Sequence, residues 1–186
     1  MGPRVRRVAG RIVALSLVLA GLGLIASAEE FTLDNGRLRA EFNERGQVML
    51  GDIRTGRRIA FSSDPTFVTI DETKTSVGEL GPAEVETKPA KLTFRYVRDP
   101  YTFDVSYELR PGWAFLSKQV VVASAGRSSF RLKEVALLDA KLDQPVLDEL
   151  KLADGRWGSF CRFGASGAAA GAPAWGLFFA VQNPYL

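Results

Sequence analysis

Carboxylate side chains are the groups best suited to proton transfer in this sequence, because its 186 residues include no histidine. Two Asp or Glu side chains held about 5 to 10 Å apart can hydrolyse a glycosidic bond. The candidates are two acids beside a predicted hairpin turn and a cluster late in the chain: Asp99 and Asp104, and Asp139, Asp143, Asp148, Glu149 and Asp154. Acids in turns and on polar strand faces are usually only solvated, so we assign no catalytic residue.

The absence of histidine also excludes several classes of site. A Ser-His-Asp or Cys-His nucleophile and a histidine metal cluster all require imidazole. The late acids lack the glycine-containing loop spacing of an EF-hand, and the single cysteine, Cys161, excludes an internal disulfide and a CxxC motif. We therefore expect neither a metal nor a cofactor. We expect Cys161 to be a buried thiol, with intermolecular pairing as the alternative.

Trp157 is the first candidate for a sugar contact, together with its neighbour Arg156. An indole ring presents a flat apolar face that can stack on the C–H side of a sugar ring, while polar groups bond the hydroxyls. Both residues lie in a glycine-containing segment, 154–158, that is predicted to be a loop, and loops commonly carry binding groups. Trp113 and Trp175, each at the start of a predicted strand, are expected to fill the core or an interface.

The first 28 residues have the layout of a secretory signal peptide. Residues 1–11 are cationic, residues 12–25 are apolar and uncharged, and Ala26-Ser27-Ala28 precedes two glutamates. Cleavage is expected after Ala28, and an uncleaved membrane anchor is the alternative, although the apolar segment is at the lower limit for crossing a bilayer. We expect a secreted or periplasmic protein, exported by the general or the twin-arginine route.

The net charge of the mature part gives no reason to expect nucleic acid or a membrane as partner. The whole chain has 24 basic and 21 acidic residues, a formal charge of +3. Four of the basic residues and none of the acidic ones precede position 29, so the mature chain has a net charge of about −1. The basic character belongs largely to the leader.

Apolar and polar residues alternate along residues 29–186, which predicts one all-β domain. Five residues from Tyr101 to Leu109 place aromatic and aliphatic groups on one face, and residues 92–96 alternate in the same way. Arg98-Asp99-Pro100 separates these runs as a turn. Short apolar runs after Gly or Pro are typical of an antiparallel β-sandwich, and they occur at 38–42, 48–50, 59–61, 67–70, 113–122, 130–138 and 175–181.

Four segments need separate interpretations. Residues 144–152 are the one plausible helix, because Val146, Leu147 and Leu150 could share a face. Residues 72–90 are predicted to be a long exposed loop or weak edge strands, and residues 164–174 a flexible loop, because they lack bulky side chains. The strand predicted at 175–181 is strongly apolar and lies almost at the end of the sequence. We therefore expect the sandwich to be incomplete at its C-terminus, with a following segment covering that strand.

The order of the turn motifs is similar to that of a known β domain. The segment 31–38 (FTLDNGRL) is followed by Phe42, Gly46, Asp52-Ile53 and 55–57 (TGR), and 176–184 (GLFFAVQNP) closes the sequence. This order resembles the galactose-mutarotase-like supersandwich, as in the N-terminal β domain of melibiase-type α-galactosidases and related glycoside hydrolases. Each motif also has a local explanation. Asn35-Gly36 suits a type I′ turn, and 55–57 suits a second turn of that kind. Pro184 ends a strand because it has no backbone N–H to donate to a neighbouring strand.

The resemblance implies the scaffold without its chemistry. Mutarotases use a histidine acid and a carboxylate base, whereas melibiase-type enzymes carry their carboxylates on a following (β/α)₈ barrel, which needs about 250 residues. The leading hypothesis is an exported non-catalytic domain equivalent to the N-terminal domain of a glycoside hydrolase, with carbohydrate or a following catalytic domain as its partner. The alternatives are a stand-alone carbohydrate-binding module and a structural or adhesive envelope protein; a small enzyme is the least favoured.

Overall fold

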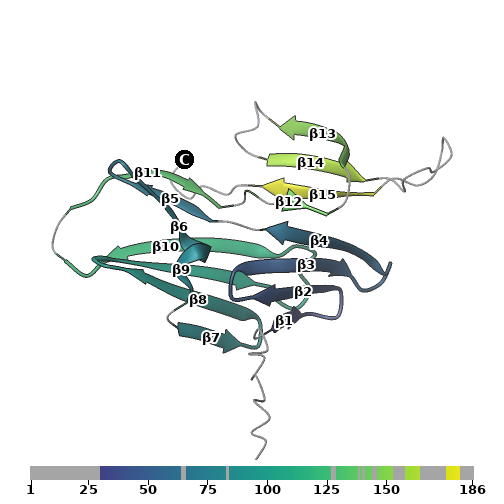
Figure 1. Ribbon diagram of the computed structural model, residues 1–186. Helices are drawn as coiled ribbons and strands as arrows, with labels where there is room; N and C mark the ends of the chain where they lie inside the picture. The colour runs from purple at the N-terminus through teal and green to yellow at the C-terminus, as the bar shows by residue number, and fades with distance from the viewer. Residues whose placement is uncertain are drawn as a thin grey trace, which may run out of the picture.

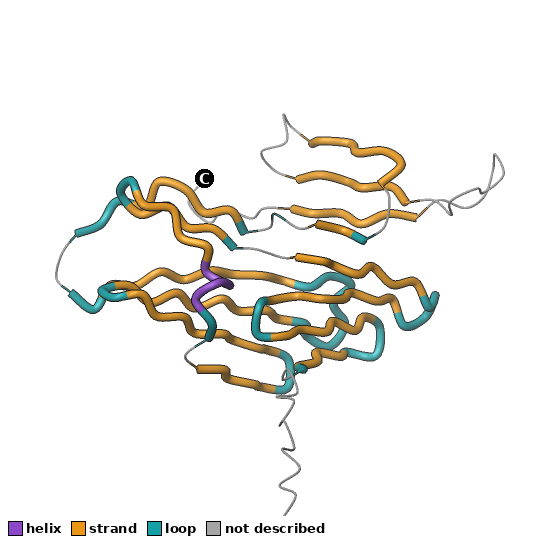
Figure 2. The backbone as a smooth tube through the Cα atoms, viewed as in Figure 1, coloured by secondary structure: helices purple, strands orange, loops and turns teal. Residues whose placement is uncertain are grey.

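The computed structural model describes residues 30–63, 66–82, 84–126, 129–137, 139, 141–143, 146–152, 158–163 and 175–180. The regular secondary structure of these ranges is almost entirely β-strand, with one short 3₁₀ helix, η1 (Val77–Leu80), and no α-helix (Figures 1 and 2). The predicted all-β class is confirmed. The strands are β1 (Phe31–Asp34), β2 (Leu38–Asn43), β3 (Gly46–Asp52), β4 (Arg57–Ser63), β5 (Phe67–Ile70), β6 (Thr73–Ser76), β7 (Glu84–Lys88), β8 (Lys91–Arg98), β9 (Tyr101–Glu108), β10 (Ser117–Ser124), β11 (Leu132–Ala136), β12 (Lys141–Leu142), β13 (Val146–Leu152), β14 (Gly158–Phe163) and β15 (Trp175–Ala180).

The strands form four antiparallel sheets. One has the order β1-β2-β3-β4-β12 and a second the order β10-β9-β8-β7, while β11-β5-β6 and β13-β14-β15 are three-stranded. Figure 1 shows the β13–β15 sheet beyond β4 and β12, and the β11–β5–β6 sheet toward the opposite end of the molecule. Most of these neighbouring strands follow one another in sequence, which agrees with the frequent turn signals, whereas β12 pairs with β4 and β11 with β5 across longer connections.

The main apolar core lies between the β1–β4 layer and the β7–β10 sheet. The ring of Phe42 on β2 lies 4.6 Å from that of Tyr107 on β9, and Phe31 on β1 contacts Phe94 on β8 edge-on at 5.5 Å between ring centroids. The predicted hairpin is confirmed, because alternate residues of both its strands are buried: Leu92, Phe94, Tyr96, Phe103, Val105, Tyr107 and Leu109. Burial of this continuous aromatic face supplies much of the driving force for folding.

One row of paired residues across strands β1 to β4 connects the main core to a second apolar cluster. Leu33, Ala40, Leu50 and Ile59 are aligned partners on β1 to β4, so all four side chains point to the same face of their sheet. At the β4 end this face is covered by β14 and β15, where Ile59 and Phe61 pack with Phe163. Leu50 packs against both clusters.

Several predicted elements differ from the observed ones. Residues 146–152 form strand β13, although a helix was the predicted possibility for this segment. Pairing with β14 provides hydrogen-bond partners for the backbone N–H and C=O groups, and this outweighs a short helical pattern of apolar residues. Strand β10 begins at Ser117, four residues later than expected. Of the two possibilities for residues 72–90, the structure has short strands, with β6 and β7 each at a sheet edge. Residues 1–28 and 164–174 lie outside the described residues.

The two glycine turns also differ from the predicted type. Gly36 has a φ of 80°, but Asn35 has no positive φ, so the turn lacks the two adjacent positive φ angles that type I′ requires. The side chain of Asn35 accepts hydrogen bonds from the N–H groups of Arg37 and Leu38 within the turn. The second turn is wider: Gly56 N–H donates to the carbonyl oxygen of Asp52 four residues earlier.

Candidate functional site

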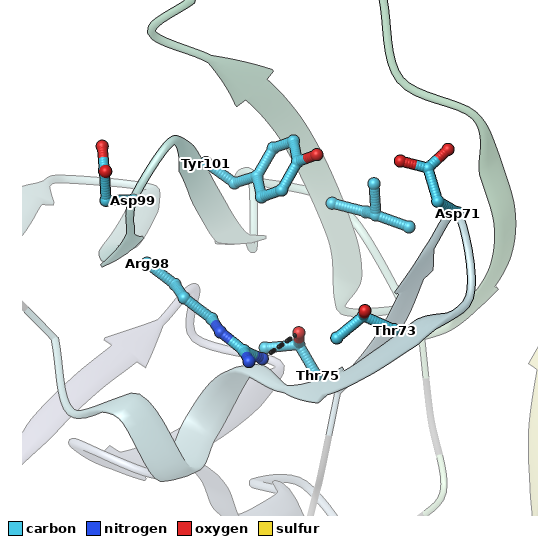
Figure 3. A pocket seen from close by; sticks show the side chains of 7 residues that line it. Asp71, Thr73, Thr75, Arg98, Asp99 and Tyr101 are labelled. Carbon is cyan, nitrogen blue, oxygen red and sulfur yellow. Dashed lines mark hydrogen bonds between the residues drawn. The ribbon is translucent and has the colours of Figure 1, made fainter.

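A polar pocket lies where the β5–β6 hairpin meets the β8–β9 turn. Its volume is about 210 Å³, and its lining consists of Ile70, Asp71, Thr73, Thr75, Arg98, Asp99 and Tyr101 (Figure 3). The two turns are distant in sequence and come together because β5, β8 and β9 all contribute side chains to the main core. The core therefore positions the pocket.

Asp71 is held at the tip of the β5–β6 hairpin by Arg131, the residue before β11. Ile70 pairs with Thr73, so Asp71 and Glu72 form a two-residue turn, and Asp71 adopts a φ of 52°, a conformation in which aspartate is enriched. The backbone N–H of Asp71 donates to the carbonyl oxygen of Arg131 at 2.8 Å, and the N–H of Arg131 donates to Asp71 Oδ1 at 3.1 Å. These bonds fix the orientation of the carboxylate.

Arg98 crosses from the last position of β8 to the β6 strand. Its Nη1 donates a hydrogen bond of 2.7 Å to the hydroxyl oxygen of Thr75, a residue that is buried. A guanidinium fixed in this way is preorganised to donate hydrogen bonds in one plane. Asp99 is the next residue and is exposed, so a cation and a carboxylate lie side by side at the turn.

Tyr101 provides the aromatic wall of the pocket. The side chain is half-buried, and its ring contacts Phe130 edge-on with 5.5 Å between centroids. In Figure 3 the ring lies between Asp99 and Asp71, with its hydroxyl directed to the Asp71 side. An apolar ring surface surrounded by a guanidinium, carboxylates and hydroxyls is suited to a small polyhydroxylated ligand, whose C–H faces and hydroxyls need both kinds of contact.

The structure separates the two acids predicted as a pair. Asp99 lines the pocket, whereas Asp104 lies on the outward face of β9 and accepts two hydrogen bonds from Arg95, at 2.8 and 3.1 Å. The hydrogen bond and charge of Asp104 raise the pKa of Arg95, and Glu84 adds to this effect. Asp104 is thus engaged in an ion pair across neighbouring strands, a structural arrangement of the sheet surface.

The other predicted candidates fall on several segments of the chain. Arg156, Trp157 and Asp154 lie outside the described residues. Asp139 and Asp143 are exposed, and Asp148 and Glu149 belong to β13. Among the residues that the structure describes, no three Cys, Asp or Glu side chains are arranged to hold a metal ion.

Two expectations about packing residues are met only in part. Trp175 is half-buried in the second cluster, 5.0 Å from Phe163 between ring centroids, as expected for a packing residue. Trp113 belongs to neither apolar cluster and lies in an exposed loop. Cys161 is half-buried against the second cluster, not fully buried, because β14 lies at the periphery of the sandwich.

Most of the pocket was not predicted from the sequence. Asp71, Thr73, Thr75 and Tyr101 fall on ordinary strand and turn positions, and of the lining residues only Asp99 was named as a candidate, as an acid beside the predicted turn. Polar residues are common at turns, and nothing in the nearby sequence shows which turns will lie next to each other in the folded protein. Sequence spacing therefore could not have identified these residues as the lining of one pocket.

Comparisons with models of protein families, with curated proteins and with solved structures found no match to this chain. A search of the described residues for a helix long and apolar enough to cross a membrane found none. The proposals below therefore rest on the geometry of the pocket and on the sequence.

Proposed function

We propose that this chain is an exported, non-catalytic β-sandwich domain that recognises carbohydrate, equivalent to the N-terminal β domain of melibiase-type glycoside hydrolases. The observation that carries the proposal is the pocket in which Arg98, Asp71 and Asp99 surround the half-buried ring of Tyr101. A pyranose ring would stack its C–H face on Tyr101, with its hydroxyls bonded by the charged groups.

A binding role is favoured over catalysis for two reasons. The chain has no histidine to act as a general acid or base near neutral pH. The candidate carboxylates beside the hairpin turn, Asp99 and Asp104, are divided, since Asp104 is ion-paired with Arg95 on the opposite face of β9 from the core. We expect no hydrolysis of aryl α- or β-glycosides by the purified protein, and turnover above a heat-denatured sample would contradict the proposal.

Export is supported by the sequence of the first 28 residues. When the full chain is expressed in a bacterium, the proposal predicts that the protein is recovered from the periplasm or medium with Glu29 as its first residue. Mass spectrometry of the purified protein tests this. A cell-associated protein that retains residues 1–28 would contradict cleavage and favour the anchor alternative.

Calorimetric titration with galactose, glucose, mannose, xylose and their short oligosaccharides tests carbohydrate recognition. Arg98→Ala should weaken binding by about 10- to 100-fold, as expected for loss of a charged hydrogen bond. Arg39→Ala is the matched control, because Arg39 is an exposed arginine on β2 whose ion-pair partner is Glu41. Failure of the wild-type protein to bind any of these sugars, or equal effects of the two substitutions, would reject the pocket as the site.

A further inference from the structure

Two aromatic rings are stacked on each other in the loop between β9 and β10. The centroids of Trp113 and Phe115 are 4.4 Å apart with an interplanar angle of 19°, and the guanidinium of Arg110 lies 5.1 Å from the centre of Trp113. We refer to Arg110, Trp113 and Phe115 as the aromatic ladder. Phe115 is 55% exposed, which leaves a large apolar surface in contact with water.

The loop that carries the ladder is held in one conformation. Pro111 and Gly112 occupy the centre of a β-turn in which Trp113 N–H donates to the carbonyl oxygen of Arg110 at 3.1 Å, and Gly112 has the positive φ, 81°, that a type II turn requires. The side-chain amide of Asn35 donates to the carbonyl oxygens of Arg110 and Trp113. The ladder is thus preorganised, which lowers the entropy lost on binding a ligand.

Charged groups lie beside the exposed ring. Arg110 Nε is 2.7 Å from Glu108 Oε1, and Glu108 is the strand partner of Lys91 on β8 and of Ser117 on β10. Insertion of this loop into a lipid layer would bring these charges into hydrocarbon at a high cost. A ligand that offers a flat C–H face together with hydroxyl groups satisfies both the ring and its charged neighbours.

We propose that the aromatic ladder is a second carbohydrate contact, on which a sugar ring stacks against Phe115, and that the ligand is therefore a polysaccharide. This inference rests on the proposed function and deepens it. The pocket lies at the start of β9 and the ladder follows its end, so an eight-residue strand of roughly 25 Å separates them and one monosaccharide cannot reach both. Two weak contacts on one chain raise the overall affinity through effective concentration.

Affinity electrophoresis in gels containing soluble galactan, glucan, mannan or xylan tests the inference. Phe115→Ala should lower the affinity for the polysaccharide that the wild-type protein binds about three- to tenfold, and should leave monosaccharide binding at the pocket unchanged. Phe178→Ala is the matched control, because Phe178 on β15 is also 55% exposed. The melting temperature of each variant verifies that the fold is retained.

The outcomes separate this inference from the proposed function. If Arg98→Ala weakens polysaccharide binding and Phe115→Ala does not, the ladder is rejected and the pocket stands. If only Phe115→Ala weakens it, the ladder stands and the pocket is rejected; no binding to any polysaccharide rejects both. Binding of the wild-type protein to phosphatidylcholine–phosphatidylglycerol vesicles that is lost in Phe115→Ala would assign the ladder to lipid and overturn the inference.

Discussion

The side-chain amide of Asn35 donates a hydrogen bond of 3.0 Å to the carbonyl oxygen of Trp113, 78 residues later in the sequence. The same amide nitrogen donates to the carbonyl oxygen of Arg110, while Oδ1 accepts from two N–H groups in its own turn. Asn35 therefore connects the β1–β2 turn to the β9–β10 loop, and the loop conformation depends on a residue of another sheet.

Replacement of Asn35 should destabilise the protein measurably. Asn35→Ala removes hydrogen bonds to both loops, including the one to the partly buried carbonyl oxygen of Trp113, so we expect the free energy of unfolding to fall by about 1–3 kcal/mol. Urea denaturation measures the change. Asn43→Ala is the control, since its side chain accepts one local bond from Arg45 N–H, and an equal loss in both variants would contradict a special role for Asn35.

Phe94 should be among the most sensitive core positions. It is fully buried and contacts the rings of Phe31, Tyr96 and Tyr107, so Phe94→Ala should cost about 3–5 kcal/mol of unfolding free energy or prevent folding. Val97 lies on the same strand and is 51% exposed, and Val97→Ala should change stability by less than about 0.5 kcal/mol. Thermal unfolding followed by circular dichroism distinguishes the two, and similar melting temperatures would contradict the core as described.

Gln47 should be replaceable by an apolar residue with a gain in stability. It is 7% exposed, and its Nε2 has no hydrogen-bond partner among the described residues. Methionine has a similar shape without the buried donor, so Gln47→Met should raise the free energy of unfolding by about 1 kcal/mol. Gln119→Met, at an exposed position, is the control and should not raise the free energy of unfolding. If Gln47→Met alone destabilises the protein, the amide of Gln47 has a hydrogen-bond partner and the prediction is contradicted.

Asp52 should contribute to stability in a pH-dependent manner. Partial desolvation acts to raise its pKa, but hydrogen bonds from the backbone N–H groups of Thr55 and Arg54 outweigh it, so the pKa lies below the ordinary value of 3.8. A carboxylate with a lowered pKa stabilises the fold above the pKa of the unfolded chain, and this contribution disappears as the pH falls through the folded value. The predicted effect therefore vanishes in the acid range.

Melting temperatures of the wild-type protein and Asp52→Asn, measured from about pH 7 to pH 2.5, test this linkage. The wild-type protein should melt higher above pH 4, and the difference should shrink at lower pH. Asp139→Asn, a charge-removing change at an exposed position, is the comparison. A difference that grows on acidification would contradict the assigned direction.

The strand pattern was largely predictable because alternation is a local property. The segment 67–70 was predicted as an apolar run and is strand β5, and the hairpin across Arg98-Asp99-Pro100 has the expected buried face. The sequence predictions were wrong where the secondary structure of a segment depends on which strand it pairs with. Residues 146–152 have a helical apolar pattern but form a strand because β14 satisfies their backbone, and Trp113 precedes a strand without joining it.

The sequence by itself determined the all-β class and the exclusion of histidine chemistry, because side-chain alternation and residue type do not depend on how the chain folds. Only the tertiary structure brought Asp71, Arg98 and Tyr101 to one pocket and separated Asp99 from Asp104. The physical reason is that successive side chains of a β-strand point to opposite faces of the sheet, so residues close in sequence can lie on different faces. The packing of one sheet on another, in contrast, places turns that are distant in the sequence next to each other.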